Sequence, residues 1–170
     1  MRVYISGKIG EEVISEATRQ KFEKAQKMLL AKGYKVVDPA CEKYQMQMDK
    51  EVEIEKKKWI EAGYGEKFDR YTHILLWDMH ILSMCDAIYL LSDWWDSDGA
   101  RTEKDFATAT KKQFFFQSKI EAMEHAGSEW CHEFLLMPPS KRSRSAHIDK
   151  LKRDFINKRL NEIWLPTEIK

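Results

Sequence analysis

The sequence has 170 residues, of which 43% are hydrophobic and 12% aromatic, a length and composition that suit a chain with a well-packed core. Its 29 basic and 28 acidic residues leave a net charge of +1, which argues against a dedicated nucleic-acid-binding protein and against an intrinsically disordered chain. No apolar run approaches the roughly 20 residues that span a bilayer, so no membrane association is expected. Three widely spaced cysteines predict neither a disulfide framework nor a zinc site, and they favour a reducing, cytoplasmic setting.

The first 40 residues have the pattern of a βαβ unit. Residues 2–6 are a β-branched and aromatic run that predicts a strand. A helix follows, marked by apolar residues three and four positions apart: Phe22, Ala25 and Leu29. Residues 34–37 predict a second strand. Strand, helix and strand in so short a segment indicate a parallel sheet with a right-handed crossover.

The middle of the chain alternates helices and strands. Residues 49–62 and 71–83 predict helices, the first with acidic and basic side chains three and four apart. Residues 86–91 are almost continuously apolar, which is typical of a strand in the middle of a parallel sheet. A loop, a helix and a strand are then expected at residues 92–99, 100–112 and 113–117.

The last third of the chain is helical in pattern and less regular. Its final helix is predicted at residues 146–163, after a basic and serine-rich connection near residues 138–144. The sequence therefore predicts a Rossmann-like or flavodoxin-like α/β fold, in which helices flank a parallel sheet in three layers. This α/β domain is expected to span residues 1–117. Residues 118–170 are expected to be a helical C-terminal extension, packed on the domain or on a second subunit.

The candidate site lies where the carboxyl ends of the parallel strands meet, because open α/β sheets bind ligands there. Three features are expected to converge at this edge. They are the glycine-containing loop at residues 6–10, Asp78 near the end of the helix before the central strand, and the acidic loop at residues 92–100 with the helix that carries Glu103.

Two interpretations of Glu103 stay open at this point. Its spacing places it on one helix face with Phe106, Ala107 and Thr110. A carboxylate there either favours the helix dipole from the first turn or is held at a cleft for nucleophilic or acid–base chemistry. Asp78 has the same two interpretations, as a solvated helix residue or as a functional carboxylate.

Several strings in the chain occur in a characteristic order: Tyr4-Ile5-Ser6-Gly7, Asp38-Pro39-Ala40, and the strand at 85–91 that runs on to Trp94, Asp98-Gly99-Ala100 and Glu103. Together they resemble the nucleoside 2-deoxyribosyltransferase-like superfamily. The similarity is greatest to a branch in which a tryptophan-containing loop leads to Ser-x-Gly-Ala-x-x-Glu. The resemblance covers about residues 1–117, and residues 118–170 have no counterpart.

The resemblance implies that Glu103 attacks the anomeric carbon of a 2′-deoxynucleoside, and that the glycosyl group then passes to a second base or to water. A carboxylate suits the oxocarbenium-like transition state of such a reaction. Asp78 would position the sugar or handle the proton of the leaving base. Ser6 and Gly7 would border the sugar, and Trp94 or its neighbour Trp95 would stack on the base or anchor the loop. The implied partners are a small nucleoside or nucleotide and further copies of the chain, as a dimer or higher oligomer.

One departure from the family pattern bears on the substrate. Lys8 follows the first glycine, where relatives usually carry proline. Lys8 and Arg101 would favour a 5′-phosphate, or else Lys8 is an ordinary exposed lysine. Asp98 and Gly99 complete the expected substrate-binding set, which includes no metal ion and no cofactor.

Two functions are therefore carried forward. The first is cleavage or transfer of an N-glycosidic bond on a nucleoside or nucleotide, by a 2-deoxyribosyltransferase or nucleotide N-hydrolase, with Glu103 as the nucleophile. The alternative is a non-catalytic nucleotide-binding or interaction module on the same fold.

Overall fold

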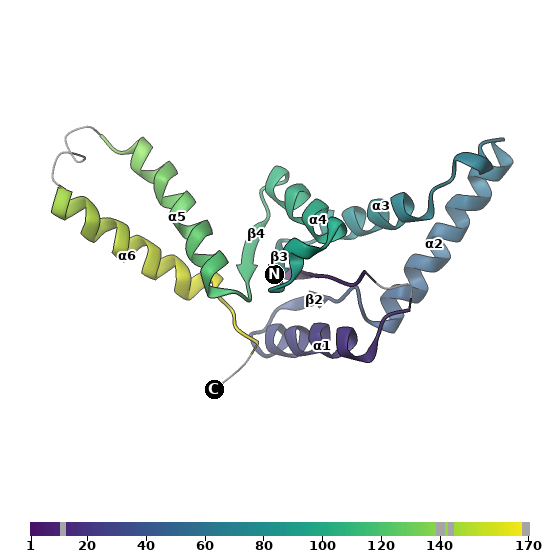
Figure 1. The fold of residues 1–170 in the computed structure, drawn as a ribbon, viewed down its shortest axis with the longest axis horizontal. Coiled ribbons are helices and arrows are strands. Elements are labelled where there is room, and N and C mark those ends of the chain that lie inside the picture. The colour runs from purple at the N-terminus through teal and green to yellow at the C-terminus, as the bar shows by residue number, and fades with distance from the viewer. Residues whose placement is uncertain (11–12, 139–141, 143–144, 168–170) are drawn as a thin grey trace. The chain divides into compact units, whose positions relative to one another are not determined.

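The computed structural model describes residues 1–10, 13–138, 142 and 145–167. The chain divides into two compact units, Met1–Phe114 and Phe115–Lys170, and each is described by itself (Figure 1). Most of the predicted basic connection, including Lys141 and Arg144, lies outside the described residues.

The sheet has four strands in the order β2-β1-β3-β4. Their bounds are Arg2–Ser6 for β1, Lys35–Val37 for β2, Ala87–Leu90 for β3 and Gln113–Phe116 for β4. The central strand β1 pairs in parallel with β2 and β3, so that Tyr4 lies opposite Val37 and Ile88. With helices on its faces, this parallel sheet confirms the predicted three-layer α/β fold with a C-terminal helical extension.

Four long helices belong to the first unit: α1 (Glu16–Ala31), α2 (Glu42–Glu61), α3 (Arg70–Ser83) and α4 (Asp98–Ala109). Two short 3-10 helices precede α3 and α4, namely η1 (Gly65–Lys67) and η2 (Trp94–Asp96). In Figure 1, α1 covers one side of the sheet, α3 and α4 lie on the other, and α2 and α3 fold back on each other through η1.

The prediction for α2 was wrong at its start, because the helix begins at Glu42 rather than near residue 49. Tyr44, Met48 and Val52 lie four residues apart and share one helix face, and Met48 and Val52 are buried. Five of the six residues between them are polar or charged (Gln45, Gln47 and residues 49–51), so this short apolar face did not stand out in the sequence.

The core explains why β1 carries part of the candidate site. All of residues 3–6 are fully buried, and alternate side chains of a strand point to opposite faces. Tyr4 and Ser6 face α4, so Val3 and Ile5 face the side on which α1 packs. The residues of β3 are all buried, as predicted for a central strand.

The strand order also explains where a ligand is expected. The chain leaves β1 for α1 on one face and leaves β3 for α4 on the other. Adjacent parallel strands whose connections diverge in this way form the topological switch point at which α/β sheets bind ligands. The carboxyl ends of β1 and β3 are therefore the edge at which side chains able to do chemistry should gather.

The second unit is a helical hairpin of α5 (Lys119–Leu136) and α6 (Ser145–Ile163). Arg159 of α6 forms a two-pronged ion pair with Glu129 of α5, with both nitrogen–oxygen distances at 2.7 Å. After α6 the chain returns to β4, where the Leu165 amide donates to the Phe116 carbonyl at 2.9 Å. Among the described residues, none of the helices is long and apolar enough to cross a membrane.

Candidate functional site

Glu103 is held beneath the sheet edge by two hydroxyl groups. It lies in the second turn of α4 and is 6% exposed. The Tyr4 hydroxyl donates to Oε1 at 2.7 Å and the Ser6 hydroxyl donates to Oε2 at 2.5 Å. Because Tyr4 and Ser6 are two residues apart on β1, both reach the same helix. The two bonds fix the plane of the carboxyl group while leaving each oxygen a further lone pair.

Asp78 supplies a second carboxyl group beside Glu103. It lies on α3 and is partly exposed, and the Tyr44 hydroxyl of α2 donates to its Oδ1 at 2.6 Å. Tyr4 interacts with Asp78 and with Tyr44 as well as with Glu103. One tyrosine from the sheet therefore links the two carboxyl groups, as the predicted convergence of Asp78, Ser6 and Glu103 requires.

The electrostatics of the two carboxyl groups favour a retained proton. Burial raises the pKa of Glu103, the charge of Asp78 raises it further, and the hydrogen bonds from Ser6 and Tyr4 oppose this rise. Burial also raises the pKa of Asp78, against the hydrogen bonds from Tyr44 and Tyr4. Two neighbouring carboxyl groups that repel each other titrate as a pair, and the first proton lost is easier to remove than the second.

The tyrosines remain hydrogen-bond donors throughout the neutral range. Burial is the main cause that raises the pKa of Tyr4, followed by the charges of Asp78 and Glu103. Burial likewise raises the pKa of Tyr44, followed by the charge of Asp78. A phenol held beside carboxylates does not ionise there, so it can steady a carboxylate without competing for its proton.

Gly7 has a steric reason to be glycine. A Cβ atom at this position would lie 2.6 Å from Cδ1 and 2.9 Å from Cβ of Leu91. Leu91 is fully buried, and its amide donates to the Ser6 carbonyl at 2.9 Å. The loop after β1 therefore passes so close to the end of β3 that a larger residue would displace it.

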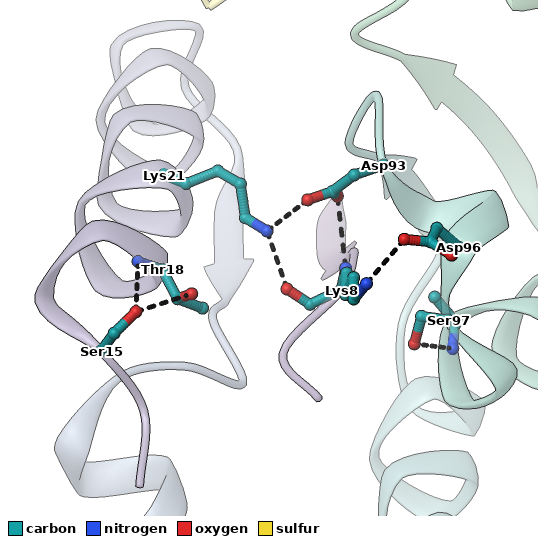
Figure 2. A network of polar contacts seen from close by, with 8 residues as sticks. Lys8, Ser15, Thr18, Lys21, Asp93, Asp96 and Ser97 are labelled. Atoms are coloured by element: carbon teal, nitrogen blue, oxygen red, sulfur yellow. Dashed lines mark hydrogen bonds and ion pairs between the residues drawn. The ribbon is translucent and has the colours of Figure 1, made fainter. Parts of the chain in front are cut away.

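Ion pairs join the loop after β1 to the loop after β3 (Figure 2). The Lys8 ammonium contacts Asp96 at 2.6 Å, and the Lys21 ammonium of α1 contacts Asp93 at 2.5 Å and the Lys8 carbonyl at 2.7 Å. The Lys8 amide donates to the Asp93 carboxylate at 3.2 Å. The sequence left open whether Lys8 meets a 5′-phosphate or is an ordinary exposed lysine, and in the structure it is an exposed residue with an acidic partner.

The other predicted binding residues engage their own loop. Asp98, in the first turn of α4, forms an ion pair with Arg101, which also donates to the Trp95 carbonyl at 2.8 Å. Trp94 lies under the Lys104 ammonium, 5.8 Å from the ring centroid, and its indole nitrogen is buried without a partner. The contacts described for these residues do not reach Glu103 or Asp78.

A third tyrosine lies near the pair on the exposed side. A Cβ atom on Gly99 would be 3.6 Å from the Tyr71 hydroxyl, although the Tyr71 side chain is half-exposed. Burial of the hydroxyl raises the pKa of Tyr71, and the charges of Asp98, Glu103 and Asp78 raise it further. Tyr71 and Asp78 are seven residues apart on α3 and so share a face.

Sequence reasoning missed these tyrosines as site residues. Tyr4 could have been found because it precedes Ser6 by two residues on a strand. Tyr44 could have been found from its four-residue spacing to Met48, and Tyr71 from its seven-residue spacing to Asp78. The face predicted for Glu103 was wrong at Thr110, which is exposed at the end of α4.

Two hollows of the described surface lie elsewhere, one between α2 and α3 and the other between the end of α2 and η1. Their volumes are about 320 and 430 Å³, and no predicted site residue lines either of them. Glu103 is nearly closed off, so a ligand would approach the pair from the side of Asp78 and Tyr71, whose side chains are partly exposed. Within the described part of the chain, no three histidine, cysteine, aspartate or glutamate side chains are grouped to hold a metal ion.

Comparison with known proteins adds a family but no activity. Residues 1–116 match the family described as Domain of unknown function (DUF4406). Nothing among the curated proteins matches the chain, and nothing among the solved structures does either. The matched segment contains Ser6, Asp78 and Glu103, and it ends at the last residue of β4. Because this match covers more than half of the chain, the chain belongs to the DUF4406 family.

Proposed function

We propose that this protein cleaves or transfers the N-glycosidic bond of a nucleoside or nucleotide, with Glu103 as the nucleophile. The observation that carries the proposal is the pair of carboxyl groups at the carboxyl ends of β1 and β3. Hydrogen bonds from Tyr4 and Ser6 orient Glu103 there. Asp78 lies beside it and accepts a hydrogen bond from the Tyr44 hydroxyl. The motif resemblance to nucleoside 2-deoxyribosyltransferases supports the same roles.

The chemistry needs two carboxyl groups in different states. The Glu103 carboxylate attacks the anomeric carbon while the bond from that carbon to the base nitrogen breaks. The leaving nitrogen keeps the bonding electrons and takes a proton from Asp78. A carboxylate next to the anomeric carbon stabilises the positive charge that develops there before the new carbon–oxygen bond is complete.

The second half of the reaction restores both groups. Water or a second base attacks the anomeric carbon of the glycosyl ester, and the bond to the Glu103 oxygen breaks. Asp78, now ionised, takes the proton of the attacking nucleophile. Burial raises the pKa of both carboxyl groups, and the charge of Asp78 raises that of Glu103 further, so the pair keeps one proton near neutrality. In the free chain this arrangement favours the proton on Glu103, so the cycle requires that the proton moves to Asp78 when the substrate binds.

The test is release of free base from a panel of substrates. Ribonucleosides, 2′-deoxynucleosides and their 5′-monophosphates are incubated with the protein, with and without a second base, and the products are separated by chromatography. We expect release from at least one substrate class, and loss of about 1,000-fold or more of the rate in Glu103→Ala. Exchange of bases without free sugar would identify a transferase, and free sugar would identify a hydrolase.

Controls separate chemistry from folding. Glu133→Ala changes an exposed glutamate of α5 and should leave the rate unchanged, while circular dichroism confirms that Glu103→Ala is folded. Release that continues unchanged in Glu103→Ala removes this residue from the mechanism. Binding of nucleosides without any release would favour the alternative, a non-catalytic nucleotide-binding module.

A further inference from the structure

The basic side chains around the candidate site are already neutralised. Lys8 is paired with Asp96, and Lys21 is paired with Asp93, as Figure 2 shows. Arg101 is paired with Asp98. Sites that hold a phosphate offer it free ammonium or guanidinium groups and free backbone amides. Lys8, Lys21 and Arg101 each already have an acidic partner, so none of them is available to a phosphate without displacing that partner.

Asp93 itself takes the place that an anionic ligand would need. Its carboxylate accepts from the Lys8 backbone amide at 3.2 Å and from the Lys21 ammonium at 2.5 Å. An amide after a strand and a lysine from the facing helix are the groups that recognise a phosphate at the edge of an α/β sheet. The Asp93 carboxylate, from the loop after β3, therefore occupies the position in which these two groups would bind a phosphate.

The charge balance makes replacement of Asp93 unfavourable. A phosphate that took the place of Asp93 on Lys8 and Lys21 would still lie near the displaced Asp93 carboxylate and near the carboxylate of Asp96. Exposed ion pairs are individually weak, but like charges left together without a counter-ion repel at any separation shorter than the screening length. An uncharged ligand meets no such repulsion.

On these grounds, and resting on the function proposed above, we infer that the site selects uncharged nucleosides and rejects nucleoside 5′-monophosphates, with Asp93 and Asp96 as the residues that determine this specificity. They act by occupying Lys21 and Lys8. This choice assigns the substrate class that the sequence left open between a nucleoside and a nucleotide.

The experiment measures binding, so that it does not depend on turnover. The four common 2′-deoxynucleosides and their 5′-monophosphates are titrated calorimetrically into the full chain carrying Glu103→Gln, at low salt. We expect the tightest nucleoside to bind at least about tenfold more tightly than its own monophosphate. Added salt should narrow this ratio, because it screens the repulsion.

Single charge removals then test the two aspartates. Asp93→Asn and Asp96→Asn should each reduce the ratio severalfold, mainly by improving the affinity for the monophosphate. Asp105→Asn removes the same charge from an exposed position on α4 and should leave the ratio unchanged. If Glu103→Gln does not fold, the same ratios are measured as kcat/KM for base release by the chain with Glu103 intact.

The outcomes separate this inference from the proposed function. Selective nucleoside binding without base release would support the inference and contradict the function. Release of base from monophosphates as fast as from nucleosides would support the function and overturn the inference. The inference would also be overturned if all three variants, Asp93→Asn, Asp96→Asn and Asp105→Asn, changed the ratio of nucleoside to monophosphate affinity equally. Absence of binding by either ligand class would overturn it as well.

Discussion

The Tyr44 hydroxyl of α2 donates to Oδ1 of Asp78 on α3 across 2.6 Å. Helix α2 had no predicted role in the site, and this bond connects it to the carboxyl group that would hold the proton of the leaving base. A hydrogen bond to the ionised form of a carboxyl group lowers its pKa, whereas burial raises it. Tyr44 therefore limits how far burial raises the pKa of Asp78.

Replacement of Tyr44 by phenylalanine tests this relationship. Loss of the hydroxyl should raise the pKa of Asp78 further, by about 1, since hydrogen bonds to charged groups contribute roughly 1.5–3 kcal/mol. The pKa is measured by a carbon-13 NMR titration of the aspartate carboxyl groups. Tyr64→Phe, at a half-exposed residue before η1, is the matched control. An unchanged titration of Asp78 in Tyr44→Phe would show that the bond does not stabilise the ionised form.

The stability of the protein should depend on pH through Glu103. Its pKa in the folded chain is raised above the ordinary value of 4.5, so folding favours the protonated form. The stability that Glu103 contributes is therefore full below about pH 4.5 and falls as the pH rises through its raised pKa.

Comparison with Glu103→Gln isolates this dependence, because glutamine does not ionise. Relative to this variant, the unmodified chain should lose melting temperature between pH 5 and pH 9. Each increment of 1 in the pKa of Glu103 corresponds to about 1.4 kcal/mol, or roughly 3–6 °C in melting temperature for a chain of this size. Glu133→Gln, at an exposed position on α5, should melt in parallel with the unmodified chain. Parallel melting of Glu103→Gln as well would contradict the raised pKa.

Gly7→Ala should destabilise the first unit. The added methyl group would lie 2.9 Å from the Cβ of the buried Leu91, and overpacking of this kind costs about 1–3 kcal/mol. Urea unfolding measures the loss. Leu91→Ala should relieve most of the clash at Cδ1, so the double variant should lose less than the two single losses added together.

Gly127→Ala provides the opposite control. Gly127 lies inside α5 with nothing within 4 Å of the added Cβ, so alanine should stabilise the helix by up to about 1 kcal/mol. If Gly7→Ala lowered the free energy of unfolding no more than Gly127→Ala does, the loop after β1 could not pass as close to Leu91 as the structure shows.

The helical hairpin of the second unit should depend on Arg159. Its two bonds to Glu129 use the fork of the guanidinium group, a geometry that lysine cannot reproduce. Arg159→Lys should cost about 1 kcal/mol of unfolding free energy in urea, since the pair is partly buried. Lys158→Ala changes an exposed neighbour and should cost less. A loss no larger than that of Lys158→Ala would show that the charge alone matters.

The sequence by itself determined the fold class and the order of its elements. A βαβ pattern, a fully apolar third strand and a helix after an acidic loop depend on short-range periodicity, which side chains reveal without tertiary contacts. The same reasoning placed Ser6, Asp78 and Glu103 at one edge, because parallel strands end together. It failed at the start of α2, where glutamines and charged residues separate the three apolar positions Tyr44, Met48 and Val52.

The tertiary structure alone decided what surrounds those carboxyl groups. Tyr4 and Tyr44 reach Glu103 and Asp78 from elements far away in sequence, and such contacts have no local signature. The partners of Lys8 and Lys21 are likewise aspartates more than 70 residues distant. The sequence alone does not show whether a charged side chain has an opposite charge beside it, because that depends on the tertiary fold. The pairing of Lys8 and Lys21 with aspartates is the observation from which we infer an uncharged ligand.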